Sequence, residues 1–267
     1  MGLVFLEEST WEELSKLETD EYTAILPTGS YEQHGYHLPI NTDSFLVSEI
    51  ALSAAKRAIN LQQDLKILMV PSLNFGISPH HMDFPGSLTL TGDTFIKIIE
   101  EICYCLSHHG FRRILLLNGH GGNTDFLKVA ARNVRDRIDI LIAVTPYWFC
   151  AKKEISEIRD SDDGGICHAG EMETSCMLYL KNELVRKGKI KKEMPRPISK
   201  FIEIDLLKEG ISINHNVIDF SESGTIGDPS LASLAKGKKF LDVIIKAVAN
   251  FIIDFSRWNF DNLNKKD

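Results

Sequence analysis

The chain has 267 residues, 43% of them hydrophobic, and a formal net charge of −7 at neutral pH. This length and composition suit a globular protein with a sizeable core, and we expect one domain over residues 1–267. A net negative charge spread over both signs argues against a nucleic-acid groove and against an anionic membrane surface. We therefore expect neither nucleic acid nor membrane as a partner.

Strand-like and helix-like segments alternate along the first 146 residues. This alternation predicts a mainly parallel central sheet with helices on both faces, which is a three-layer α/β/α sandwich. Apolar runs predict strands at 22–27, 65–70, 112–118 and 139–145, and the periodic segments between them predict helices at 43–59, 93–109 and 124–137.

The alternation weakens after residue 146, where we expect a helix near 171–185 and an amphipathic helix from Phe240 to Trp258. The second of these tracts carries four charged residues, so it predicts a core helix and not a membrane span.

The five cysteines lie at positions 103, 105, 150, 167 and 176, and no two of them form a Cys-x-x-Cys pair. An odd number without this spacing predicts neither a disulfide framework nor a zinc ribbon. The first residues also lack the basic region and the cleavage site of a signal peptide. We therefore expect a cytoplasmic protein.

The first cluster of reactive side chains follows the strand predicted at 22–27. It contains Glu32, His34, His37 and Asp43 within twelve residues. Ligands of open α/β folds bind at the carboxyl ends of the strands. Two carboxylates and two imidazoles in that place indicate a metal site.

Three further clusters lie at predicted strand ends or helix starts. The loop at 76–90 carries His80 and His81, the segment Asn118-Gly-His120-Gly-Gly-Asn123 follows the third strand, and Cys167-His168-Ala-Gly-Glu171-Met-Glu173 precedes a helix. If these segments converge, their imidazoles and carboxylates favour Zn, Mn or Fe(II) over soft-metal chemistry. Glu171 and Glu173 would diverge by about 200° on a helix, so at most one is expected to face a shared centre.

Other interpretations of single motifs remain open. The glycines at 119–122 could cradle a nucleotide phosphate, although they match neither GxGxxG nor a segment ending in Gly-Lys-Ser/Thr. Trp148 and Phe149 are expected as core aromatics, or as the wall of a pocket because they follow a strand end. We expect structural roles for His108, His109 and His215, which lack reactive neighbours.

Taken together, the motifs resemble the creatininase (creatinine amidohydrolase) family, in particular its His-Ala-Gly-Glu type and not creatininase itself. The resemblance runs from about residue 20 to residue 240 and rests on five segments: Glu32-Gln-His34-Gly-x-His37-Leu-Pro with Asp43, Phe84-Pro-Gly-Ser-Leu-Thr-Leu90, Asn118-Gly-His120-Gly-Gly-Asn123, His168-Ala-Gly-Glu-x-Glu173-Thr-Ser, and Gly227-Asp-Pro229.

This resemblance implies a creatininase-like fold with two divalent metal ions per subunit, Zn, Mn or Fe(II). By position, Asp43 would bridge the two metals, with Glu32 and His120 on one and His34 on the other. His37 is then expected beside the ligands or in the pocket. The resemblance also implies a homo-oligomer, a hexamer as in other family members.

The fifth ligand departs from the pattern of creatininase, which has a metal-binding glutamate where this chain has Gly122. We expect Glu171 to replace it, with Glu173 in reserve. Creatininase also has an acidic residue at the position of Cys167 and an aromatic one at Gly121, so we expect a substrate other than creatinine.

The implied activity is metal-dependent hydrolysis of a C–N bond in a small-molecule amide. The bond would belong to a cyclic amide, a formamide or a peptide. Gly121, Gly122 and Glu171 favour the deformylase or peptidase side of the family over creatininase, and we expect a non-protein C–N bond of the amidohydrolase or deformylase type. A hydroxide bridging two metals would attack the amide carbon while His168 shuttles a proton, and Glu173 is the second catalytic candidate. A dinuclear metallophosphoesterase and a non-catalytic metal-binding protein on the same fold are the alternatives.

Overall fold

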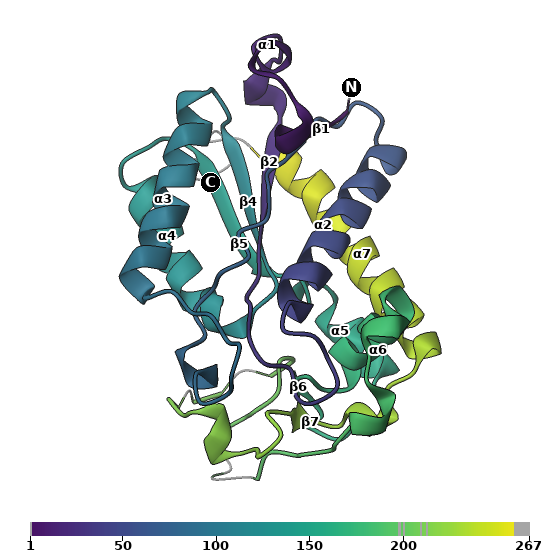
Figure 1. Ribbon diagram of the computed structural model, residues 1–267. Helices are drawn as coiled ribbons and strands as arrows, with labels where there is room; N and C mark the ends of the chain where they lie inside the picture. The colour runs from purple at the N-terminus through teal and green to yellow at the C-terminus, as the bar shows by residue number, and fades with distance from the viewer. Residues whose placement is uncertain (1, 197–198, 200, 209, 212, 259–267) are drawn as a thin grey trace.

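A five-stranded sheet forms the centre of the computed structural model, which describes residues 2–196, 199, 201–208, 210–211 and 213–258. The strand order is β1-β3-β2-β4-β5, and each neighbouring pair is parallel (Figure 1). The strands are β1 (Leu3–Phe5), β2 (Thr23–Thr28), β3 (Ile67–Met69), β4 (Arg113–Asn118) and β5 (Leu141–Pro146).

Helices cover both faces of this sheet (Figure 1). Successive residues of β4 point to opposite sides, so Leu115 and Leu117 pack in one apolar core while Ile114 and Leu116 pack in the other. The first core is shared with α2 (Thr42–Leu61), α5 (Lys152–Ile158), α6 (Glu171–Leu180) and α7 (Leu234–Ser256), and the second with α3 (Gly92–His108) and α4 (Thr124–Arg135). The predicted α/β/α sandwich with a mainly parallel sheet is confirmed.

The predicted helices at 43–59, 93–109 and 124–137 match α2, α3 and α4 within two residues at each end. The helix near 171–185 is shorter than expected, since α6 ends at Leu180. The C-terminal helix begins six residues earlier than expected, because the Ser233 side chain accepts a hydrogen bond from the backbone N–H of Lys236 and caps its start.

Small elements complete the fold. A two-stranded antiparallel sheet joins β6 (Ile166–His168) to β7 (Ile226–Gly227) below the carboxyl ends of the central strands (Figure 1). The short helix α1 (Trp11–Leu14) follows β1. The 3-10 helices are η1 (Leu6–Glu8), η2 (Thr19–Glu21), η3 (Pro79–His81), η4 (Gly121–Asn123), η5 (Phe149–Ala151), η6 (Asn182–Leu184), η7 (Lys187–Lys189), η8 (Val217–Asp219) and η9 (Pro229–Leu231).

All five cysteines are free. None of the helices in the described part of the chain combines the length and the apolar character needed to cross a bilayer.

The crossing of α6 and α7 depends on a glycine. A Cβ atom at Gly237 would overlap the backbone carbonyl of Ser175, and it would lie 3.0 Å from the Cβ of Tyr179. Neither the carbonyl nor the Cβ atom can move without displacing a helix. The two helices can therefore approach this closely only because position 237 has no side chain.

We expect Gly237→Ala to lower the free energy of unfolding by about 1–3 kcal/mol, as overpacking of a core does. Helix propensity alone would predict the opposite effect, because alanine is more favourable than glycine in a helix by about 1 kcal/mol. Urea denaturation measures the change. The matched control is Gly188→Ala, where a Cβ atom would meet no other atom within 4 Å. Equal stability of the two variants would contradict the packing argument.

Candidate metal centre

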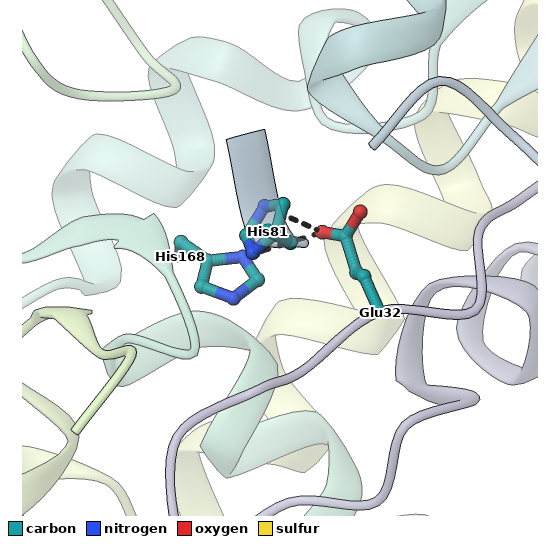
Figure 2. Close-up of side chains that lie close together, drawn as sticks. All are labelled: Glu32, His81 and His168. Atoms are coloured by element: carbon teal, nitrogen blue, oxygen red, sulfur yellow. Dashed lines mark ion pairs between the residues drawn. The ribbon is translucent and has the colours of Figure 1, made fainter. Parts of the chain in front are cut away.

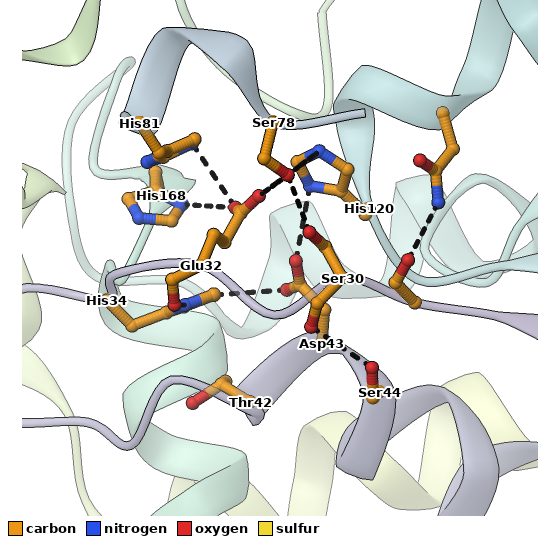
Figure 3. Close-up of polar contacts among 12 residues, drawn as sticks. Ser30, Glu32, His34, Thr42, Asp43, Ser44, Ser78, His81, His120 and His168 are labelled. Atoms are coloured by element: carbon orange, nitrogen blue, oxygen red, sulfur yellow. Dashed lines mark hydrogen bonds and ion pairs between the residues drawn. The ribbon is translucent and has the colours of Figure 1, made fainter. Parts of the chain in front are cut away.

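The predicted reactive segments meet at the carboxyl ends of the central strands (Figure 3). Glu32 and His34 follow β2, Asp43 lies in the first turn of α2, and His120 follows β4. Gly119 allows this approach, because a Cβ atom there would lie 2.6 Å from the Cβ of Val47 in α2. The structure thus brings four of the five expected ligands together, and all four are buried.

Asp43 lies between two histidines in this cluster (Figure 3). Its Oδ1 atom is 3.0 Å from Nε2 of His34, and its Oδ2 atom is 3.1 Å from Nδ1 of His120. Each oxygen of one carboxylate therefore faces a different ring, which is the arrangement expected of a carboxylate that bridges two ions.

Glu32 faces three further histidine nitrogens with its two oxygens (Figures 2 and 3). Oε2 lies 3.2 Å from Nε2 of His120 and accepts a 2.5 Å hydrogen bond from the Ser78 hydroxyl. Oε1 lies 3.2 Å from Nε2 of His81 and 3.5 Å from Nδ1 of His168. His81, which the sequence left unassigned, is therefore part of the cluster.

One nitrogen of each of three rings contacts a backbone carbonyl, which assigns its proton. Nδ1 of His34 lies 3.0 Å from the Glu32 oxygen, Nε2 of His120 lies 2.9 Å from the Ile77 oxygen, and Nε2 of His168 lies 2.7 Å from the Gln33 oxygen. A carbonyl only accepts, so each of these nitrogens carries a hydrogen. In the neutral rings the other nitrogen is bare and faces a carboxylate oxygen.

This arrangement fits divalent cations. A bare ring nitrogen about 3 Å from a carboxylate oxygen is unfavourable unless a proton or a cation lies between them. In addition, Oε1 of Glu32 and Oδ2 of Asp43 are buried without a hydrogen-bond partner. Metal-binding histidines characteristically donate their other N–H to a carbonyl or a carboxylate, as these three do to carbonyls.

The pKa shifts show how strongly these groups interact when no cation is present. Burial alone would lower the pKa of His34, but the Asp43 carboxylate beside it raises that pKa to about 10. Burial raises the pKa of the Glu173 carboxyl to about 7. Burial lowers the pKa of His168 well below its usual value, and nearby His34 lowers it further. Protons thus take the place of cations at some of these groups.

Within the described residues, three overlapping groups have ligand atoms within 4.8 Å of one another. They are Glu32 with Asp43 and His120, His34 with His168 and Glu173, and Glu32 with His81 and His168. All their members are buried.

Glu171, which we expected as the fifth ligand, belongs to none of these groups. Its carboxylate accepts hydrogen bonds from the backbone N–H groups of Asp160 and Ser161 at 3.0 and 2.9 Å, and from Nζ of Lys236 at 2.5 Å. The side chain is buried, but it joins α6 to the neighbouring loop and to α7 and does not face the cluster. These contacts give no support to Glu171 as the fifth ligand, and that role stays a prediction.

The side chain of Glu173, on the same helix, points toward the cluster. Its carboxylate accepts a 2.7 Å hydrogen bond from the backbone N–H of Ala169 and shares a ligand group with His34 and His168. Position 122 has no room for a side chain, because a Cβ atom there would lie 2.5 Å from Nε2 of His120 and would overlap the Ile77 carbonyl.

A cavity of about 210 Å³ opens onto the cluster. Its lining includes Trp148, Cys167 and also His215, for which we had expected a structural role only. A wider cavity of about 780 Å³ adjoins it and shares His80 and His215 with it. The remaining walls of the inner cavity outside the cluster are His80, Gly119, Gly121, Gly122, Leu206, Val217 and Ile226.

Other predicted residues lie outside the cluster. His37 is buried and its Nε2 lies 2.9 Å from the Thr174 hydroxyl, beside the ligands as expected. Trp148 is buried in the core and also walls the pocket, so both of its expected roles hold. Phe149 is 55% exposed and is not a core residue. His108 and His109 are exposed at the end of α3.

Comparison with known proteins agrees with this geometry. The model of the creatininase (creatinine amidohydrolase) family matches residues 7–252. The creatinine amidohydrolase of Pseudomonas putida is 28% identical, over 93% of this chain and 96% of its own. The mycofactocin precursor peptide peptidase of Mycobacterium tuberculosis is 27% identical, over 86% of this chain and 84% of its own.

Solved structures show the same likeness in three dimensions. The crystal structure of a creatininase superposes with a TM-score of 0.79 and 28% identity, covering 96% of this chain and 99% of that one. Two further creatininase structures are described as a Zn-Zn type and as a Mn form. Because the family model spans most of the chain and the fold agrees, this protein belongs to the creatininase family.

Proposed function

We propose that this protein is a metal-dependent amidohydrolase that cleaves a C–N bond with the help of two divalent cations. The observation that supports this most directly is the pair of buried, unpartnered carboxylate oxygens on Glu32 and Asp43, each facing a ring nitrogen. The names of the relatives, an amidohydrolase and a peptide peptidase, both describe hydrolysis of C–N bonds.

The ligand groups suggest how the cations would be held. Glu32, Asp43 and His120 would hold one. His34 and Glu173 would hold the other together with Asp43, whose second oxygen faces His34. When bound, such cations polarise a carbonyl oxygen and make a water acidic enough to supply hydroxide near neutral pH.

His168 would move the proton in this reaction. Its Nε2–H group donates a hydrogen bond to the Gln33 carbonyl, so Nδ1 carries no hydrogen. Nδ1 lies 3.5 Å from Oε1 of Glu32. Burial disfavours the charged ring, so the ring gives up an accepted proton readily. We infer that Nδ1 accepts a proton from the nucleophile and returns it to the departing nitrogen.

The cavities favour an uncharged or cationic amide that is larger than creatinine. The inner cavity continues into the wider one, which leaves room for a substrate that extends past the cluster. None of the described residues that line either cavity is a lysine or an arginine, the usual partners of phosphate groups. Among the family's substrate types, a peptide-like amide therefore fits better than a formamide nucleotide.

Hexameric assembly and a cytoplasmic location stay predictions from the sequence.

We expect Glu32→Gln to abolish turnover in a panel of metal-loaded assays with creatinine, a formamidopyrimidine nucleotide and short peptides. Loss of a residue that hydrogen-bonds to a metal ligand costs about 10–100-fold in metal affinity or activity. Loss of a ligand itself should therefore cost at least about 100-fold. Glu101→Gln makes the same change at an exposed site paired with Lys97 and should keep full activity.

Retention of full activity in Glu32→Gln would contradict the assignment of Glu32 as a metal ligand. In the same panel, release of phosphate from a phosphate ester would identify a phosphoesterase instead. Full metal loading without any turnover would identify a non-catalytic metal-binding protein.

The two glutamates of α6 should respond differently to the same substitution. We expect Glu173→Gln to reduce the bound metal from two ions to one per chain, measured by elemental analysis after dialysis. Glu171→Gln should keep both ions but lower the free energy of unfolding by about 1–3 kcal/mol, since Lys236 loses its buried partner. The opposite pattern would restore Glu171 as the fifth ligand.

Chelation should lower the melting temperature, and Zn²⁺ or Mn²⁺ should restore it. A cation at 100 times its Kd stabilises the folded state by about 2.7 kcal/mol. Mg²⁺ and Ca²⁺ should have little effect, because they prefer sites made of oxygen atoms while this one contains imidazoles. The melting temperature of Asp43→Asn should not depend on Zn²⁺. Equal stabilisation by Mg²⁺ would argue against histidine ligation.

A further inference from the structure

Gln33 lies between two ligands in sequence, and its side chain is buried against two of the cavity histidines. The amide oxygen Oε1 accepts a 2.8 Å hydrogen bond from the backbone N–H of Gly35. The amide nitrogen Nε2 donates a 2.9 Å hydrogen bond to the backbone oxygen of Gly224. A flipped amide would lose both bonds, so these partners define its orientation.

The second hydrogen of this amide has two ring nitrogens within reach. Nδ1 of His81 lies at 2.8 Å and Nε2 of His168 at 3.0 Å. Nε2 of His168 already carries a hydrogen, because it lies 2.7 Å from the Gln33 carbonyl oxygen, which can only accept. That nitrogen has no free lone pair for the amide. The second amide hydrogen therefore goes to Nδ1 of His81.

We propose that Gln33 is a positioning residue that holds the proton of His81 on Nε2, so that this ring faces Glu32 as an N–H group and not as a metal ligand. With Nδ1 accepting from the amide, a neutral His81 ring keeps its only hydrogen on Nε2. That nitrogen lies 3.2 Å from Oε1 of Glu32 (Figure 2). Its N–H group is not aligned for a hydrogen bond, so Oε1 keeps no hydrogen-bond partner. In His34 and His168 the hydrogen instead lies on the nitrogen that contacts a backbone carbonyl, and the bare nitrogen faces a carboxylate. In His120 the hydrogen lies on Nε2, and the bare Nδ1 faces Asp43.

This assignment selects among the three ligand groups. The group of Glu32, His81 and His168 has suitable distances, but His81 cannot use Nε2 as a ligand while Gln33 donates to its Nδ1. Gln33 thus leaves the other two groups for cations. Oε1 of Glu32 faces His81, on the side away from His120. Oε2 accepts a hydrogen bond from the Ser78 hydroxyl. The role given to Glu32 rests on the proposed function, whereas the proton position does not.

The test is nitrogen NMR of the full-length protein, labelled with ¹⁵N at histidine and loaded with diamagnetic Zn²⁺. The His81 signals are assigned by their absence in His81→Asn. We expect Nε2 of His81 to be protonated and Nδ1 to be an unprotonated hydrogen-bond acceptor, with neither nitrogen bound to Zn²⁺. A proton on Nδ1 of His81, or a Zn²⁺-bound Nε2, would overturn the proposal without any variant having to fold.

Gln33→Glu then tests the cause. This substitution replaces the donor by an acceptor of the same shape, so we expect the proton of His81 to move to Nδ1. His168 should keep its proton on Nε2, because that proton is held by the backbone carbonyl of residue 33. Its signals should shift only because the substituted group lies beside that nitrogen. Gln63→Glu, the same substitution at an exposed position, should leave both rings unchanged.

An unchanged His81 in a folded Gln33→Glu protein would contradict the role of the side chain. Failure of the proposed function gives a different result. In that case the amide panel shows no turnover, while the wild-type protein still shows the expected proton pattern on His81.

Discussion

The burial of Glu32 and Asp43 among histidine rings is the constraint on which the rest of this structure depends. Removing a carboxylate from water costs several kcal/mol even in a relaxed protein interior. Ser78 and the surrounding ring nitrogens offset part of this cost, but two carboxylate oxygens remain without a hydrogen bond. Cations bound as proposed would offset the remainder and would also give the cluster its chemistry. Stability and reactivity would then come from the same ions.

The parallel sheet explains why such a cluster can be assembled at all. Parallel neighbours bring the carboxyl ends of β2, β4 and β5 to one edge, so segments far apart in the sequence deliver their side chains to one place. The β6–β7 pair then carries His168 to the same edge. The carbonyls of Glu32, Ile77 and Gln33 hold the rings, so the backbone of these loops sets which nitrogen faces inward.

The sequence predicted the secondary-structure elements that have a regular apolar spacing and the reactive residues that lie at strand ends. It did not predict the direction in which a side chain points. The strands β2, β3, β4 and β5 and the helices over 43–137 were predicted from apolar runs and regular spacing. The short strands β1, β6 and β7 were not predicted. The convergence of four reactive side chains was predicted because each follows a strand end or begins a helix, whereas their roles as metal ligands are implied by the resemblance. Glu171 and Glu173 differ only in which way they point, and that depends on Lys236, 65 positions away from Glu171. His215 reaches the cavity through a long irregular segment that has no local signal.

Glu171 and Glu173 point in different directions from the first turn of α6. Position 122 cannot hold a side chain here, because the Ile77 carbonyl and the His120 ring occupy the space. In the proposed site, a carboxylate for the second cation would come from another element. The first turn of α6 could supply it, because that turn lies beside His34 and His168. That turn is held from the opposite side by Glu171, which ties it to the loop at 160–161 and to α7. Glu171 thus supports the site by fixing the helix that presents Glu173. It is buried and makes no contact with the cluster because its carboxylate binds the loop at 160–161 and Lys236.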